Sequence, residues 1–430
     1  MRGSALVPVC LAGLIAAAGC GGRDGEQAYR AINPGAAVFW DRQTAETATL
    51  LQDIVTAFNA QYDGVPIKVE RAGGYEDIHR KVLASLSAGT VPALAVGYPN
   101  TTIEYVRADA AVALDSLIHD SELGFRPEEL EDFYPAVLEM NRYPTFGGKM
   151  YSFPFAKSVL MLYFNRVVLR AAGIDHPPAT WDEFVEQCRR VKQQSGKFAY
   201  AINVDCSTLD GMIFSMGGEV YDGTQTLYDG PAALRAFHLY QTLAREGLAY
   251  RIAGGYDDDI ALTQGEVAFT MRSSAASSGI AEVMKDRMDE WGMARIPQDD
   301  PANPKTVLYG PNFVLFQTTP EQQRAGWAFI KYLTSVENSA RWTLGTGYLP
   351  VRKSAAAHPD VQRLWEERPY RKVTFDCLSF ARTEPNVPGW QEVRDLVERA
   401  LTDIIAGRVE AEQAAPALKR DADAVLSKWQ

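Results

Sequence analysis

Short apolar runs alternate with longer amphipathic segments along most of the chain. Within residues 46–62, apolar side chains recur at the three- and four-residue spacing of one helix face: Leu51, Ile54, Val55 and Phe58. Strand patterns flank this predicted helix at 37–40 and 65–69, and another follows at 91–98. The repeated order of strand, helix and strand predicts an α/β fold built on mostly parallel sheet.

The same alternation continues through the second half. The uninterrupted apolar run at 159–164 predicts a strand that is buried on both faces. Thr180 and Glu183 have capping-box spacing and predict a helix start, with Cys188 on the buried stripe of that helix. Further elements are expected as helices over 231–246 and 321–333, strands over 267–271 and 313–316, and a helical tail from Trp390 interrupted at Pro416.

The N-terminus has the pattern of an export signal. The apolar run from Ala5 to Ala18 is too short to cross a bilayer but fits the core of a signal peptide. The small residues before Cys20 resemble the bacterial lipobox, although Ala17 stands where that motif usually has Leu. We therefore expect a signal peptide over 1–19, then a lipidated Cys20 and a flexible tether over 20–35. Ordinary signal-peptide cleavage without lipidation is the alternative.

Composition narrows the possible partners. A chain of 430 residues predicts two or three domains, and its net charge of -11 without any basic block argues against nucleic acid. Cys10 would be removed with the signal peptide and Cys20 would carry the lipid. Three cysteines then remain, at 188, 206 and 377, so at most one disulfide can form. Neither these cysteines nor the five histidines have metal-ligand spacing, and no metal or cofactor is expected.

Catalytic motifs are also missing from the sequence. The segment Ile213–Gly217 lacks the first glycine of a nucleophile elbow, and Gly147-Gly148-Lys149 lacks the rest of a P-loop. No catalytic residue is therefore predicted.

Aromatic and hydroxyl residues instead gather at Gly-rich or Pro-rich junctions between elements, where a rigid scaffold displays binding groups. These candidates are Tyr75, Tyr98, Ser158, Ser273, Gly310 and Tyr348. Aromatic faces cover the carbon side of sugars or glycerol, hydroxyls and backbone N–H groups bond to oxygens, and an arginine can bind phosphate with two parallel bonds. Each residue alone is more simply a packed loop side chain, so only the joint pattern predicts a binding site.

Several short runs occur in the order and spacing of a known family. They include Ala57-Phe58-Asn59, Gly74-Tyr75-Glu76, Leu162-Tyr163-Phe164-Asn165, Pro177-Pro178-Ala179-Thr180-Trp181, Gly265-Glu266-Val267-Ala268-Phe269, Ser273-Ser274 and Thr346-Gly347-Tyr348-Leu349-Pro350. With these runs the chain resembles the family 1 extracellular solute-binding proteins of ABC importers. It looks most like their glycerol-3-phosphate or glycerophosphodiester branch.

The resemblance implies a periplasmic-binding-protein-like fold of two α/β lobes joined by a multi-strand hinge. The implied N-terminal lobe spans 36–156 plus 312–358, and the C-terminal lobe spans 157–311 plus 359–430. The hinge is expected near 155–159 and 309–313.

Ligand positions carried over by matching motif are Tyr75, Ser158, Ser273, Gly310, Tyr348 and Arg394, with Trp40 and Asp41 as further N-terminal-lobe candidates. For Arg394, a solvent-facing helix charge is an equal alternative from periodicity.

Two departures from the branch leave the solute open. Pro99 and Asn100 follow Tyr98 where the branch usually has an acidic residue, and residues 204–207 replace expected tryptophans. Another phosphodiester or an oligosaccharide therefore remains an alternative.

The resulting functional hypothesis is an exported, membrane-anchored lipoprotein that captures a small polar solute between its lobes. It would act as a monomer, without catalysis, and deliver the solute to ABC permease subunits in the membrane. The rival hypotheses are a secreted lipoprotein hydrolase acting on glycans or phosphodiesters, and a structural lipoprotein of the cell envelope.

Overall fold

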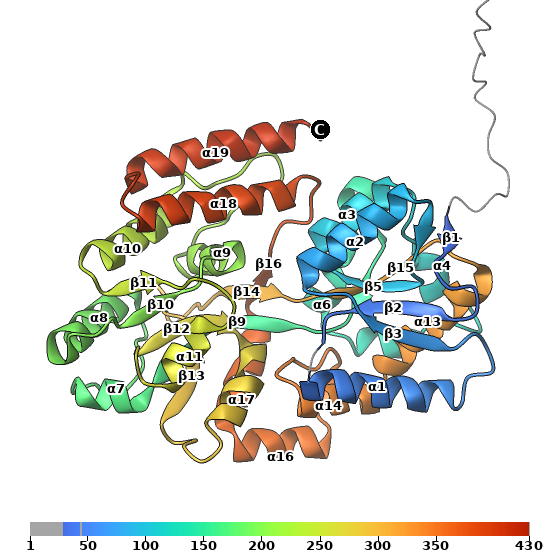
Figure 1. The fold of residues 1–430 in the computed structure, drawn as a ribbon, viewed down its shortest axis with the longest axis horizontal. Helices are drawn as coiled ribbons and strands as arrows, with labels where there is room; N and C mark the ends of the chain where they lie inside the picture. Colours follow the sequence, from blue (N-terminus) through green and yellow to red (C-terminus); the bar gives the residue numbers. More distant parts are fainter. Residues whose placement is uncertain (1–28, 44, 430) are drawn as a thin grey trace, which may run out of the picture.

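The computed structural model describes residues 29–43 and 45–429. The predicted signal peptide, Cys20 and most of the predicted tether lie outside these residues. The described chain forms two lobes side by side, each with a central sheet flanked by helices (Figure 1). This confirms the predicted α/β architecture. Of the described helices, none combines the length and apolarity that crossing a membrane requires.

The N-terminal lobe is built on a five-stranded sheet. Its order is β3 (Ile67–Arg71), β2 (Ala37–Asp41), β5 (Leu94–Gly97), β15 (Asn312–Leu315) and β8 (Phe153–Pro154). The strand β2 pairs in parallel with β3 and β5, whereas β15 is antiparallel to β5 and β8. Because β2 is buried along its whole length, helices must cover both faces of this sheet.

In the sequence, the helices of this lobe come shortly after its strands. The main ones are α1 (Ala45–Asn59), α2 (Tyr75–Ser87), α3 (Pro99–Arg107), α13 (Pro320–Leu333) and α14 (Val336–Gly345). Shorter segments between them are β1 (Arg30–Ala31), β4 (Thr90–Val91), α4 (Asp115–Ile118), α5 (Pro127–Glu131), α6 (Pro135–Glu139), β6 (Arg142–Tyr143), η1 (Pro144–Phe146) and β7 (Lys149–Met150).

The C-terminal lobe has a seven-stranded sheet. Its main order is β11 (Ala249–Arg251), β10 (Tyr200–Ile202), β12 (Phe269–Ser273), β9 (Ser158–Asn165), β14 (Thr306–Tyr309) and β16 (Ala381–Thr383), with β13 (Trp291–Arg295) also paired to β9. All eight residues of β9 are buried, as its apolar run predicts.

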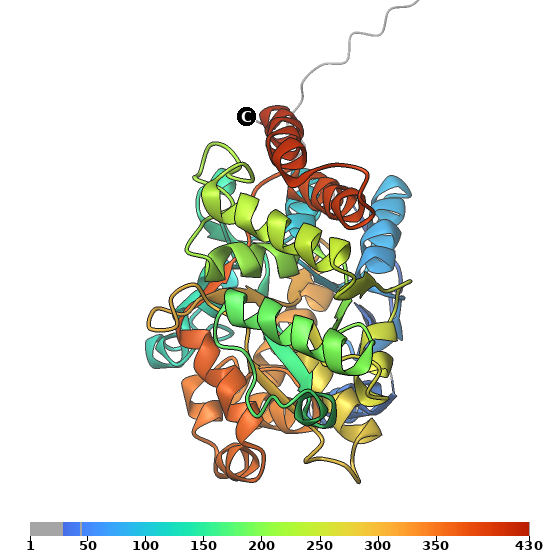
Figure 2. The ribbon, with the colours of Figure 1, turned by 90° about the vertical axis from the view of Figure 1, so that its left-hand side faces the viewer.

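Helices are layered on this sheet, as the end-on view of the lobe shows (Figure 2). They are α7 (Arg166–Ala171), α8 (Trp181–Ser195), α9 (Cys206–Ser215), α10 (Pro231–Arg245), α11 (Asp257–Thr263), η2 (Ser274–Ala276), α12 (Ser277–Val283), α17 (Pro369–Asp376), η3 (Cys377–Ser379), α18 (Trp390–Ile405) and α19 (Ala411–Ser427). The helices α15 (Lys353–Ala356) and α16 (Pro359–Glu367) pack instead on α14 of the N-terminal lobe.

The structure bears on three of the sequence expectations. The Thr180 hydroxyl accepts the Glu183 N–H at 3.2 Å and begins α8, as predicted. The predicted interruption at Pro416 is wrong, because α19 continues through this residue and the break lies before it, at Gly407 with φ +67°. Pro416 lies only in the second turn, where its missing N–H costs one bond near the helix start. The three described cysteines are free and buried, so they form no disulfide.

The chain crosses between the lobes where β8 leads to β9 and where β14 leads to β15. Gly310 has φ +124°, and a Cβ there would lie 2.1 Å from the Ala156 carbonyl oxygen, so this crossing requires glycine. Lys157 is fully buried and donates to the carbonyl oxygens of Gly310 at 3.0 Å and Pro311 at 3.2 Å. The two crossing segments are therefore bonded into one hinge.

Candidate functional site

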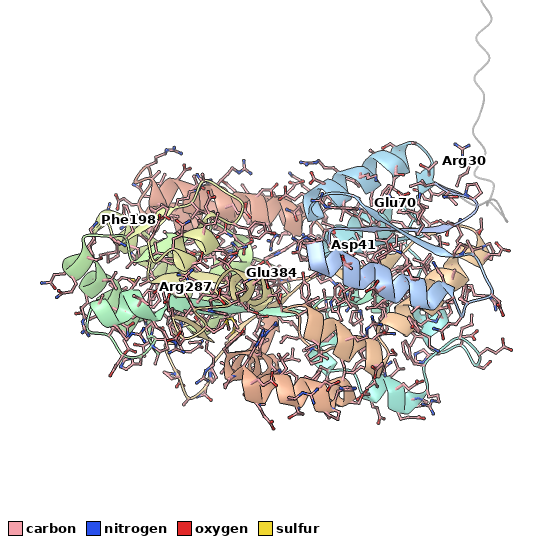
Figure 3. All side chains as sticks on the ribbon, turned by 60° about the horizontal axis from the view of Figure 1, so that its bottom comes forward. Arg30, Asp41, Glu70, Phe198, Arg287 and Glu384 are labelled. Atoms are coloured by element: carbon pink, nitrogen blue, oxygen red, sulfur yellow. The ribbon has the colours of Figure 1, made fainter. Side chains whose placement is uncertain are left out.

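Parallel strands in both lobes end toward the space between them. In the N-terminal lobe, Arg42, Tyr75 and Tyr98 lie just beyond the carboxyl ends of β2, β3 and β5. In the C-terminal lobe, Asp205, Ser273 and Glu384 lie at or just beyond the carboxyl ends of β10, β12 and β16. Because ligands of open α/β sheets bind outside these strand ends, the site is expected between the lobes. Asp41 and Glu384 mark its two sides in Figure 3.

Three predicted tyrosines come together on the N-terminal side. The rings of Tyr75 and Tyr98 have centroids 4.7 Å apart, and the hydroxyls of Tyr75 and Tyr348 are 3.5 Å apart. Tyr348 also stacks on Trp342 at 6.3 Å. Burial raises the pKa of Tyr75 and of Tyr98, so both phenols stay neutral and can donate hydrogen bonds. This side offers aromatic faces edged with hydroxyls.

Arg42 lies among these rings. Its guanidinium carbon is 4.7 Å from the Tyr75 ring centroid, and its two terminal nitrogens lie 3.5 Å from the Tyr75 hydroxyl and 3.4 Å from the Tyr256 hydroxyl. Tyr256 belongs to the C-terminal lobe, immediately before α11, so Arg42 connects the two lobes.

The turn that carries Arg42 is fixed by Asp41. One carboxylate oxygen of Asp41 accepts the Gln43 N–H at 2.6 Å. Burial raises the pKa of Asp41 to about 6, opposed by its bonds to the Gln43 and Arg42 backbone. Trp40 is buried and donates to Glu70 at 3.3 Å, so its ring packs within the lobe.

The C-terminal side is a network of charges around Arg394 in α18. This arginine forms an ion pair with Glu384, and it donates to Asp205 at 3.2 Å and to the Ser207 hydroxyl at 3.0 Å. Its side chain is only 16% exposed, which contradicts the alternative of a solvent-facing charge. Burial alone would lower the pKa of Arg394, but the carboxylates hold it well above its usual range.

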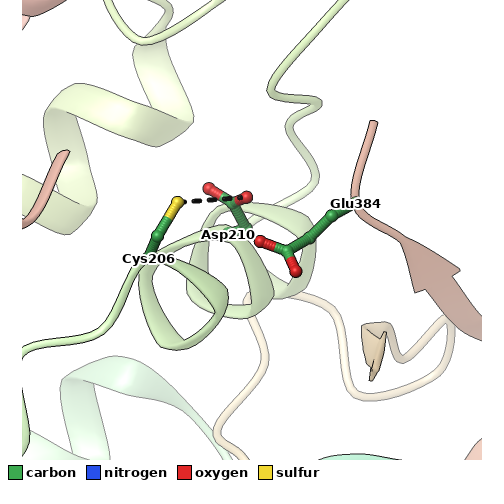
Figure 4. A group of neighbouring side chains, drawn as sticks. All are labelled: Cys206, Asp210 and Glu384. Carbon is green, nitrogen blue, oxygen red and sulfur yellow. Dashed lines mark hydrogen bonds between the residues drawn. The ribbon is translucent and has the colours of Figure 1, made fainter. Parts of the chain in front are cut away.

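Behind this network lie two buried residues of α9, and Figure 4 shows them beside Glu384. The Cys206 thiol contacts Asp210 at 3.7 Å, and the Tyr228 hydroxyl donates to Asp210 at 3.1 Å. Burial and the nearby Glu384 charge raise the pKa of Asp210 well above its usual range.

Cys206, Asp210 and Glu384 offer sulfur and oxygen atoms within 4.8 Å of one another. A soft divalent cation could use such donors. However, Arg394 is already paired with Glu384, and its charge would repel a cation there. We therefore interpret the trio as part of the hydrogen-bonded network.

The other predicted residues lie at the hinge and at its edge. The Ser158 hydroxyl is buried and donates to the Tyr309 carbonyl at 3.4 Å. Gly310 is the next residue after Tyr309 in the chain. The Ser273 hydroxyl accepts the Ala275 N–H at 3.2 Å and begins η2. At this edge, a Cβ on Gly347 would lie 2.4 Å from the Ala275 oxygen, so the lobes approach closely.

The lobes also contact each other between α3 and α18. Asn100 donates to Gln391 across the gap at 2.8 Å. Beside this contact is an enclosed pocket of about 20 Å³, lined by residues that include Tyr98, Gly310, Glu384 and Trp390. An open cavity of about 680 Å³ lies along α18, lined by residues that include Val204, Arg251, Asp395 and Glu398. The enclosed pocket has room for about one water, so this arrangement of the lobes leaves no space there for a larger molecule.

Sequence reasoning did not identify Arg42 or Glu384 as candidates. Arg42 could have been found from its place at the end of the first strand of the sheet. Glu384 follows a strand of only three residues, which is too short to give a periodic pattern in the sequence. Its position beside Arg394 is therefore known only from the folded structure.

Comparisons with known proteins agree with this geometry. The model of the bacterial extracellular solute-binding protein family matches residues 53–369. The sn-glycerol-3-phosphate-binding periplasmic protein UgpB of Pectobacterium atrosepticum is 23% identical over 415 residues, covering 91% of each chain.

Two solved structures share the fold. UgpB of Mycobacterium tuberculosis in complex with glycerophosphocholine superposes with a TM-score of 0.82 at 22% identity, covering 92% of this chain and 99% of that one. The GacH receptor of Streptomyces glaucescens, solved unliganded and with acarbose, gives a TM-score of 0.79 at 18% identity, with the same coverage of each chain. The chain belongs to the bacterial extracellular solute-binding proteins.

Proposed function

We propose that this chain captures a hydroxyl-rich solute for an ABC importer, the solute being glycerol 3-phosphate, a glycerophosphodiester or a sugar. One observation carries the proposal. A network of carboxylates, guanidinium and hydroxyl around Arg394 lies across the interlobe space from the rings of Tyr75, Tyr98 and Tyr348.

These two sides match the two kinds of surface on such solutes. Aromatic rings cover C–H faces, while carboxylate oxygens accept and guanidinium groups donate hydrogen bonds to hydroxyls. A solute that contacts both sides favours the closed arrangement, because a ligand shifts an equilibrium by its differential affinity for the two states. The proposed site residues are Tyr75, Tyr98, Ser158, Ser273, Gly310, Tyr348 and Arg394.

A thermal-shift screen tests the proposal directly. The panel contains glycerol 3-phosphate, glycerophosphocholine and common disaccharides, with an unrelated amino acid as the control. At a hundred times its Kd, a solute that binds only the folded state stabilises it by about 2.7 kcal/mol. If no hydroxyl-rich solute raises Tm above the control, the proposal is wrong.

Delivery to the membrane forms the second part of the proposal. We expect Cys20 to be lipidated after removal of 1–19, so that a monomer is held beside its permease. Metabolic labelling with an alkyne fatty acid should mark the wild type and not Cys20→Ser. Secretion of an unlabelled wild-type chain would instead support ordinary signal-peptide cleavage.

A turnover assay separates binding from the rival hydrolase function. The family consists of binding proteins, and we expect every solute in the panel to be recovered unchanged. Product above a heat-treated control, from glycerophosphodiesters or oligosaccharides, would contradict a pure binding role.

A further inference from the structure

The two arginines of the candidate site, Arg42 and Arg394, differ in the groups of the protein that neutralise their charge. Arg394 contacts Glu384, Asp205 and Ser207, so its charge and much of its donor capacity are used within the protein. Within the described residues 29–43 and 45–429, Arg42 forms no ion pair with a carboxylate, although the charge of the neighbouring Asp41 carboxyl interacts with it. Its two polar contacts are with phenol hydroxyls, at 3.5 and 3.4 Å, near the outer limit of a hydrogen bond. Most of its five N–H donors therefore remain available.

The turn around Arg42 contains further unused hydrogen-bonding groups. Asp41 Oδ1 and Gln43 Nε2 are buried and have no partner in the described chain, whereas Asp41 Oδ2 holds the turn by accepting the Gln43 N–H. Buried polar groups in folded proteins are normally satisfied, so both atoms are open to a partner from outside the chain. These residues lie at the carboxyl end of β2, where the strand ends of the sheet face the other lobe.

We propose that Arg42 binds an anionic group of the solute, a phosphate or a carboxylate, while the Arg394 network contacts its hydroxyls. This inference rests on the proposed function and specifies the orientation of the solute. A guanidinium binds such oxyanions through two parallel charge-assisted bonds.

Charge favours Arg42 over Arg394 for this role. An anion beside Arg394 would meet the carboxylates of Glu384 and Asp205, and like charges brought together repel. Beside Arg42 an anion would meet the hydroxyls of Tyr75 and Tyr256, both of which can donate, and one carboxyl, Asp41, which already accepts the Gln43 N–H.

The position of Arg42 also couples anion binding to closure. Arg42 and Tyr75 belong to the N-terminal lobe, and Tyr256 belongs to the C-terminal lobe. An anion held among them contacts both lobes and so favours the closed state.

The test uses the full mature chain and begins with inorganic phosphate alone. Thermal shifts are measured in phosphate and in sodium chloride of equal ionic strength, for the wild type, Arg42→Gln, Arg42→Lys and Arg394→Gln. The matched control is Arg71→Gln, because Arg71 is an exposed arginine at the end of the neighbouring strand β3 and its loss changes the net charge equally. We expect phosphate to stabilise the wild type and Arg71→Gln, and its affinity to fall about tenfold or more in Arg42→Gln.

Two matched pairs of solutes extend the test, glycerol with glycerol 3-phosphate and galactose with galacturonate. Arg42→Gln should weaken only the charged member of each pair, and Arg42→Lys should be intermediate because it retains the charge without the planar fork.

Three outcomes would overturn the inference: phosphate no better than chloride, equal losses in Arg42→Gln and Arg71→Gln, or a loss of phosphate binding confined to Arg394→Gln. The last outcome would leave the proposed function intact. If phosphate binds through Arg42 while no hydroxyl-rich solute binds at all, the proposed function fails instead.

Discussion

The two sides of the candidate interlobe site differ in how their arginines are stabilised. On the C-terminal side, Arg394 is surrounded by carboxylates that stabilise it before any solute arrives. On the N-terminal side, Arg42 and the tyrosines make long, weak contacts and leave polar atoms unpartnered. Removing the charge of Arg394 should therefore reduce mainly the stability of the fold. Removing the charge of Arg42 should reduce mainly solute binding.

The largest effect is expected from Arg394→Ala. This change leaves the Glu384 and Asp205 carboxylates without their cation, and breaking a buried pair in this way costs about 3–5 kcal/mol. The free energy of unfolding from urea denaturation measures the loss. On the other side, Arg42→Ala should cost only about 1 kcal/mol, because it removes a ring contact and two long hydrogen bonds to phenol hydroxyls.

A double variant controls for the loss of Arg394 packing. Replacing both partners, as Arg394→Met with Glu384→Leu, should recover part of the lost stability because one unpaired charge is also removed. Equal destabilisation by Arg394→Ala and Arg42→Ala would contradict the proposed difference between the two sides.

A smaller effect is expected from Tyr75→Phe, which sharpens the comparison from the aromatic side. The ring and its contact with Tyr98 remain, while the hydroxyl that lies 3.5 Å from both Tyr348 and Arg42 is lost. Solute affinity measured by calorimetry should fall by about 0.5–1.5 kcal/mol, with little change in Tm. Tyr250→Phe, at a half-buried tyrosine on β11, is the matched control. A fall in Tm without a change in affinity would assign the Tyr75 hydroxyl a structural role.

The last effect concerns the pH dependence of stability and the partly exposed Glu398, on the charged side. Burial, together with the charges of Asp205, Asp395 and Glu76, raises the pKa of Glu398 to about 7. Because the folded state holds this proton more tightly than the unfolded chain, stability falls as pH rises from about 4.5 to about 7 and then levels off. In Glu398→Gln this contribution to the fall should disappear, as Tm values at pH 5 and pH 8 would show. An unchanged difference between these two Tm values would mean that Glu398 does not titrate in this window.

The sequence predicted the elements well because apolar spacing is a local property. The strand at 37–40, the helix around Leu51–Phe58 and the buried strand 159–164 all occur, with ends that differ from the expected ones by at most three residues. Tyr75, Tyr98 and Tyr348 could also be proposed together, since each lies at a junction of elements.

The charge balance of the site could not be predicted in the same way. Whether an arginine is neutralised depends on which distant carboxylates reach it, and Asp205 and Glu384 come from different strands of one sheet. The family resemblance gave Arg394 as a ligand position, and the sequence did not identify Arg42.

Lys157 gives the hinge a chemical reporter. Its amine is shut between the crossing segments, and burial lowers its pKa well below the usual value, so it carries less charge than a surface lysine. An uncharged amine is nucleophilic, and what protects this one from acylating reagents is lack of access. The rate at which Lys157 becomes acylated, followed by mass spectrometry, would therefore time the spontaneous opening of the joint, and a bound solute that keeps the lobes together should slow it.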